Sequence, residues 1–238
     1  MNQKNSFIAD IFTLATIPLF SQIVGIMLTP VITRIYSPES FALSSFFGST
    51  VTIISIFSTF GYHNSIVLPS RGREALNMVF VCFTINCLVT LFSLIMIIFG
   101  SPLFLRLDIF SSFKEFLYLI PFFVFFHGLY QTLRFYNTRE KYFKLIALSR
   151  IFETSVNKSW VLIAGFYKGN SASHLIYGTL AASFIKSLFL VRQFLKQGAG
   201  FRKYVSISDM IFLSKKYIKF PKYTIWSELL SRIPHFLT

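Results

Sequence analysis

Six long runs of apolar residues, separated by short polar segments, constrain this chain more than any other feature of its sequence. An α-helix needs about 20 apolar residues to cross the roughly 30 Å hydrocarbon core of a bilayer. The expected spans are residues 11–32, 41–61, 79–99, 116–133, 146–166 and 173–191. Charged residues make up only 13% of the chain, about half of the share usual in soluble domains. The sequence therefore predicts an all-α integral membrane protein in which residues 1–191 form one six-helix transmembrane lobe.

The net charge of +14 is explained by where the basic residues lie. Sixteen of the 23 Lys and Arg residues lie in the amino-terminal tail and in the connections that follow the second, fourth and sixth spans, counting Arg150 at the start of the fifth span with the connection before it. Four lie in the other connections, and three lie inside spans. Because cytoplasmic loops carry the excess of Lys and Arg, the amino terminus is expected in the cytoplasm. The basic side is suited to anionic membrane lipids, and no run suits a nucleic-acid-binding module.

The longest connection, residues 192–222, is expected to be a basic cytoplasmic linker. Within it, residues 209–219 mix lysines with apolar side chains, which fits either an interfacial amphipathic helix or a solvated basic segment. A seventh apolar run begins near Tyr223 and ends with the sequence at Thr238, before a full span is complete. Residues 223–238 are therefore interpreted as the truncated start of a second lobe.

Motifs of soluble enzymes are missing from the sequence. It contains no glycine-rich phosphate loop ending in Gly-Lys-Ser/Thr and no His-Glu-x-x-His pattern. Glu153 is the only carboxylate well inside a complete span, so a paired-carboxylate site is not expected. The four histidines lie in separate segments: His63, His127, His174 and His235. The sequence thus predicts no enzyme activity, no catalytic residues, no cofactor and no metal site.

Ionisable residues inside spans are the best indication of a functional site, because a charge near the bilayer centre is costly unless it faces water or a partner. Lys158 lies near the middle of the fifth span, which also contains Glu153 and Asn157. Five residues separate Lys158 from Glu153, about 140° around a helix, so these two are not expected to pair. Lys186 lies about 7.5 Å from the cytoplasmic end of its span, and snorkelling of its ammonium group to the interface is the favoured interpretation.

Two arginines complete the candidate residues. Arg34, at the outer end of the first span, is interpreted as an interfacial anchor near Glu39. Glu228 and Arg232 are four residues apart and are suited to an intrahelical ion pair. The candidates for a substrate cavity are Lys158, Lys186, Glu153, Asn157, Arg34 and Arg232.

Four segments resemble the polysaccharide (O-antigen type) flippases of the multidrug/oligosaccharidyl-lipid/polysaccharide exporter superfamily. The segment TPVITRIYSPESF (29–41) is similar to the end of the first helix in that family, with Ala42 where the family often has Gly. FGYHNSIVL (60–68) resembles the exit of the second helix, and YNTREKYFKLIALSR (136–150) the basic linker into the fifth. FPKY (220–223) resembles the start of the seventh.

The resemblance implies one lobe of a two-lobed transporter and the beginning of the second lobe, so the chain is expected to be a fragment of a longer transporter or a prematurely terminated copy. It also implies a function: movement of an undecaprenyl-pyrophosphate-linked oligosaccharide across the bacterial inner membrane, for O-antigen or other surface polysaccharide, with other assembly proteins as potential partners. A cation-coupled multidrug exporter of the same fold is one alternative, and Glu153 is the carboxylate that it would need. A membrane enzyme of polysaccharide assembly is the other.

Overall fold

The computed structural model of the chain describes residues 19, 22–104, 114–197 and 205–232. Within these ranges every regular element is a helix. The elements are the helix Gln22–Ile35, α2 (Pro38–Ile56), η1 (Phe57–Thr59), η2 (Tyr62–Val67), α3 (Gly72–Phe104), η3 (Lys114–Leu119), α5 (Ile120–Arg139), α6 (Phe143–Lys168), α7 (Ala172–Gln197), α8 (Ile207–Lys216) and α9 (Lys219–Arg232).

Four of the predicted spans are confirmed as segments long and apolar enough to cross a membrane. They are Pro38–Thr59, Gly72–Gly100, Lys114–Arg139 and Ala172–Lys196. On α3, Leu88, Phe92 and Phe99 leave 61%, 63% and 79% of their surfaces exposed along one helix face. A soluble protein would not leave such a stripe in water, whereas lipid covers it at no cost. The chain is therefore an all-α, multi-pass membrane protein.

The first and fifth predicted spans differ from these four. The described part of the first is the shorter apolar helix Gln22–Ile35, and residues 11–18 and 20–21 lie outside the described part of the chain. The fifth corresponds to α6, whose 26 residues are enough to cross a bilayer. However, α6 is not among the helices that are apolar enough by composition, because it carries several charges.

Two compact units are formed by segments that alternate along the chain. The first unit contains residues 1–45 and 137–193, and the second contains residues 46–136 and 194–238. Each unit is described separately below.

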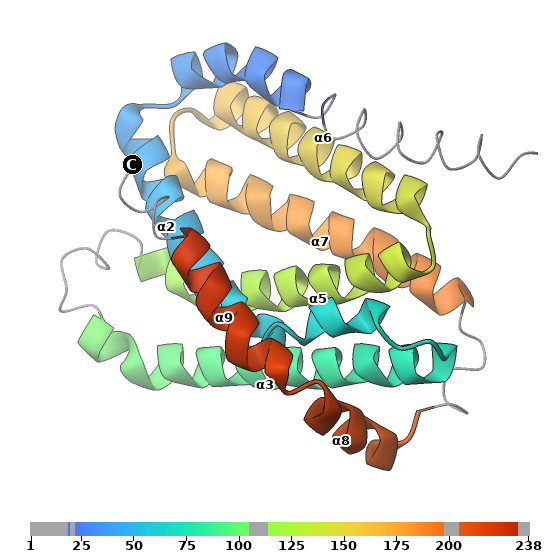
Figure 1. Cartoon of the computed structure of the whole chain (residues 1–238). Helices are drawn as coiled ribbons and strands as arrows, with labels where there is room; N and C mark the ends of the chain where they lie inside the picture. Colours follow the sequence, from blue (N-terminus) through green and yellow to red (C-terminus); the bar gives the residue numbers. More distant parts are fainter. Residues whose placement is uncertain (1–18, 20–21, 105–113, 198–204, 233–238) are drawn as a thin grey trace, which may run out of the picture. The chain divides into compact units, whose positions relative to one another are not determined.

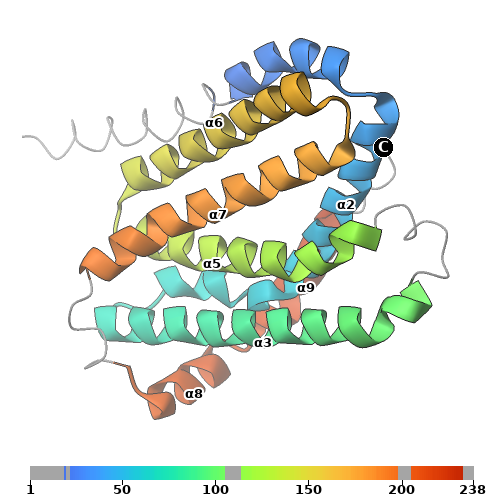
Figure 2. The same cartoon turned by 180° about the vertical axis from the view of Figure 1, so that it is seen from behind.

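The first unit is built on the hairpin of α6 and α7, which run side by side (Figures 1 and 2). Gly169 makes the turn between them with φ +81°, a conformation that glycine adopts without strain. The next residue, Asn170, accepts hydrogen bonds from the Ser37 backbone N–H and the Ser40 hydroxyl at 3.0 and 2.8 Å. The start of α2 is thereby fixed to the α6–α7 turn.

The helix Gln22–Ile35 packs against α6 in the same unit. Ile32 and Tyr36 form a buried cluster with Val161 of α6 and Leu175 of α7. The Tyr36 hydroxyl donates a 2.8 Å hydrogen bond to the Val161 carbonyl. Gly165 permits this approach, because a Cβ at that position would lie 2.6 Å from the Ile35 side chain.

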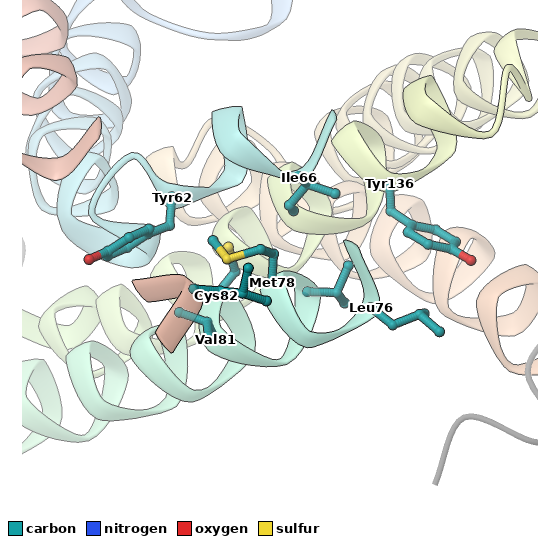
Figure 3. Close-up of a cluster of buried hydrophobic side chains, with 9 residues drawn as sticks. Tyr62, Ile66, Leu76, Met78, Val81, Cys82 and Tyr136 are labelled. Atoms are coloured by element: carbon teal, nitrogen blue, oxygen red, sulfur yellow. The ribbon is translucent and has the colours of Figure 1, made fainter. Parts of the chain in front are cut away.

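The second unit has its apolar core at the first turns of α3. The buried members of this cluster come from η2, α3, α5 and α8: Tyr62, Ile66, Leu76, Met78, Val79, Val81, Cys82, Tyr136 and Leu213 (Figure 3). Further along α3, Asn86 donates a 2.9 Å hydrogen bond to the Phe125 carbonyl of α5. Gly128 leaves room for it, since a Cβ there would lie 2.2 Å from the Asn86 Oδ1 atom.

Candidate functional site

A polar seam joins α6 to α7 in the first unit. Glu153 and Asn157 are four residues apart and therefore lie on one face of α6. The Lys186 ammonium group of α7 donates to the Glu153 carboxylate and forms an ion pair with it. One turn further along α6, the Asn157 amide donates a 3.2 Å hydrogen bond to the Thr179 hydroxyl. The seam fixes the register of the hairpin through two polar contacts.

Lys186 therefore does not snorkel as the sequence suggested. Its side chain is 11% exposed, and its charge is balanced across the hairpin by Glu153. Glu153 is seven residues from the start of the fifth predicted span, and Lys186 is five residues from the end of the sixth. In an antiparallel hairpin these positions lie at similar depths. That match of depth and opposite charge was the sequence signal for the pair.

Lys158 lies outside this seam, about 100° around α6 from Asn157. Its side chain is half-buried, and among the described residues it has neither an ion-pair nor a hydrogen-bond partner. One turn later, Val161 and Leu162 pack against the helix Gln22–Ile35. From Lys158 to the end of α6 at Lys168 is ten residues, a rise of about 15 Å. This cation, which has no partner in the described part of the chain, thus lies about half a bilayer from the helix end, in a position to attract an anionic group.

The remaining candidates do not join Lys158. Arg34 is exposed at the end of the helix Gln22–Ile35, and no ion pair joins it to Glu39 in the described part of the chain. The side chain of Arg232 and the whole of His235 lie outside the described residues, so the expected pair of Arg232 with Glu228 stays a prediction. Within the described ranges, no three His, Cys, Asp or Glu side chains gather as a metal site would require.

A buried histidine in the second unit was not singled out by the sequence. His63 of η2 is 6% exposed, and its Nδ1 atom lies 2.6 Å from the Thr59 hydroxyl. Its Nε2 atom is 3.8 Å from the Glu228 carboxylate of α9, beyond hydrogen-bond distance. Burial, reinforced by the positive charge of Arg134, lowers the pKa of His63 to about 4. Although Glu228 favours the protonated ring, burial has the larger effect, and His63 is neutral at pH 7.

This environment predicts a loss of stability in acid. The His63 pKa is about 4 when folded and about 6.5 when unfolded, so the unfolded chain binds more protons between these values. The free energy of unfolding should therefore decrease as the pH falls from 6.5 to 4, by on the order of 3 kcal/mol. Thermal unfolding in detergent over this range measures it. His63→Gln should flatten the dependence of the unfolding temperature on pH. The control, His174→Gln, should keep that dependence. An equal dependence on pH in the two variants would contradict this account of His63.

Fold and site together define a multi-pass membrane protein, helical throughout its described ranges, with a cation halfway along one helix that has no partner among the described residues. A family model described as polysaccharide biosynthesis protein matches residues 31–232. The chain therefore belongs to the polysaccharide biosynthesis protein family, and its role is in polysaccharide biosynthesis at a membrane. No curated protein and no solved structure matches the chain.

Proposed function

We propose that this chain moves a lipid-linked oligosaccharide across the bacterial cytoplasmic membrane, as a transporter and not as an enzyme. The substrate class proposed is an oligosaccharide on undecaprenyl pyrophosphate, destined for a surface polysaccharide such as O-antigen. Membership of the polysaccharide biosynthesis family supports the pathway, and the multi-pass fold supports action within the bilayer.

Lys158 is the observation that carries the proposal. A partly buried ammonium group without a partner in the described protein is favourable only where water or an anion reaches it. A pyrophosphate needs such a group, because its negative charge is costly to bring into a medium of low dielectric constant. Lys158 would stabilise the pyrophosphate in transit, while the sugar stays hydrated and the lipid tail remains among the acyl chains.

A cation-coupled exporter of the same fold is a weaker candidate. Coupling to a cation needs a carboxylate that can bind it inside the membrane. Glu153, the carboxylate expected for this purpose, is already neutralised by Lys186. Cation binding at Glu153 would first have to displace Lys186 and separate its buried charge from this carboxylate, which is costly.

The proposal is tested by the location of the precursor in cells that lack this protein. The complete lipid-linked oligosaccharide should accumulate on the cytoplasmic leaflet, and restoring the protein should remove it. An enzyme of assembly would instead leave an incomplete or unpolymerised precursor. That result would reject the transporter.

The orientation proposed for the chain, with the amino terminus in the cytoplasm, has its own test. Lys144 and Lys168 lie at opposite ends of α6, and both are exposed. In intact cells, an impermeant thiol reagent should label Lys168→Cys and not Lys144→Cys, and permeabilisation should equalise the two. The unsubstituted chain gives the background from Cys82 and Cys87, and the reverse labelling pattern would invert the topology.

A further inference from the structure

Helix α8 is held to the second unit by one of its faces. Met210, Leu213 and Tyr217 pack against the core cluster at the start of α3, and Leu213 is only 1% exposed. The Tyr62 hydroxyl of η2 also donates a 3.0 Å hydrogen bond to the Ser214 carbonyl. These contacts show that residues 207–216 form a docked helix and not the solvated basic segment that the sequence also allowed.

The contacts of α8 place it at the end of a membrane span. Asp209 forms a 3.0 Å ion pair with Arg73, and the Ser206 backbone N–H donates to the Asn77 side chain at 3.0 Å. Arg73 and Asn77 belong to the first two turns of α3, where the candidate membrane span Gly72–Gly100 begins. Asn77 is thus about 7.5 Å along the span, so α8 lies at the depth where headgroups meet acyl chains.

The other faces of α8 divide into an apolar flank and a basic side. Ile207 and Ile211 are 76% and 52% exposed and lie about 40° apart, beside the docked face. Lys215 and Lys216, followed by Lys219 in the first turn of α9, are all exposed. The single acidic residue of α8, Asp209, is engaged by Arg73. Phe212, 65% exposed, lies between the lysines and adds apolar surface there.

We propose that α8 is a binding site for anionic phospholipids of the surrounding leaflet. Ile207 and Ile211 insert at the level of the upper acyl chains, and Lys215, Lys216 and Lys219 bind the headgroup phosphates. The arrangement is that of an interfacial helix, with apolar and cationic faces side by side. It holds the connection between α7 and α9 against the membrane, whichever substrate is transported.

The test places a fluorescent reporter on the apolar flank of the full chain. Ile211→Cys is labelled with the environment-sensitive dye NBD, and the chain is reconstituted in nanodiscs in which either phosphatidylglycerol or phosphatidylcholine carries the bromine quencher. The overall lipid composition is identical in the two preparations. The unsubstituted chain gives the labelling background, and NBD on free cysteine gives the iodide quenching of a fully exposed dye.

The expected result is a dye shielded from iodide and quenched about twofold more by brominated phosphatidylglycerol than by brominated phosphatidylcholine at low salt. The stronger quenching by brominated phosphatidylglycerol should disappear in the triple variant Lys215→Gln/Lys216→Gln/Lys219→Gln. It should also decline at high salt. It should remain in Lys114→Gln/Lys168→Gln, whose exposed lysines belong to other connections. Equal quenching by the two lipids, iodide quenching equal to that of the free dye, or an excess that survives in the triple variant would each overturn the proposal.

Discussion

Replacing Lys158 by Glu should abolish export of the lipid-linked oligosaccharide and leave the amount of protein in the membrane close to normal. The substitution inverts the charge at a half-buried position of α6 where no described partner is lost. A carboxylate there repels the pyrophosphate that the lysine is proposed to attract, and at low dielectric constant this repulsion is strong. Surface polysaccharide per cell, normalised to membrane protein, measures the effect.

Two further substitutions separate a substrate contact from a tolerated structural charge. Lys158→Arg should keep most of the export, because the charge is retained. Lys158→Leu should reduce export, because the charge proposed to attract the pyrophosphate is lost. The abundance of the protein should stay normal, because no described partner of Lys158 is left with an uncompensated charge. Lys168→Glu, at the exposed end of the same helix, is the matched control and should have little effect. Full export by Lys158→Leu would remove this lysine from the site.

Removing one member of the Glu153–Lys186 pair should lower the free energy of unfolding more than removing one member of an exposed ion pair. Glu153→Leu leaves the Lys186 ammonium group buried without its carboxylate, and breaking a buried pair costs about 3–5 kcal/mol. The lower end of this range applies, because the Glu153 side chain is still 34% exposed. The variant should therefore unfold at a lower temperature in detergent and be less abundant in membranes.

The double substitution tests whether this loss is due to breaking the ion pair between Glu153 and Lys186. Glu153→Leu/Lys186→Leu leaves no uncompensated charge and should recover most of the stability, as should the exchanged pair Glu153→Lys/Lys186→Glu. Asp209→Leu, which removes the carboxylate that pairs with Arg73 where both side chains are exposed (43% and 56%), is the control and should cost less than 1 kcal/mol. Additive losses in the double variant would show that the two residues do not act as a pair.

Hydropathy predicted four of the helical spans, and the fifth predicted span, which it describes only in part, contains the candidate site. The spans that match the structure are those in which lipid-facing and core-facing residues are both apolar, so that length and composition are sufficient. Helix α6 departs from this rule because it carries Glu153 and Lys158. Glu153 is compensated by Lys186 of α7, whereas Lys158 has no partner among the described residues.

Contacts between helices could not be predicted from the apolar pattern of each span taken alone. Lys186 was expected at the membrane interface because the pattern of a single span does not include the carboxylate at a similar depth in the span beside it. The pairing with Glu153 depends on the tight hairpin at Gly169, which fixes the register of α6 against α7. The sequence did identify Lys158 from its depth alone, since that argument needs only a position within one helix.

The environment of His63 could not be predicted for a similar reason. Gly61, with φ +73°, turns the chain into η2, and a Cβ on Gly61 would lie 2.8 Å from the Thr224 side chain of α9. This close approach brings Glu228 to His63 across a sequence separation that no local pattern encodes.

The most direct test of the account is a translocation assay with purified protein in vesicles. An undecaprenyl-pyrophosphate-linked oligosaccharide is incorporated into both leaflets, and an impermeant enzyme added outside modifies only the sugars of the outer leaflet. With the wild-type chain, the modified fraction should rise above one half with time. With Lys158→Glu it should stop at one half, as in protein-free vesicles. If the wild-type chain, the Lys158→Glu variant and protein-free vesicles all stop at the same fraction, the proposal that this chain moves lipid-linked oligosaccharides would be contradicted.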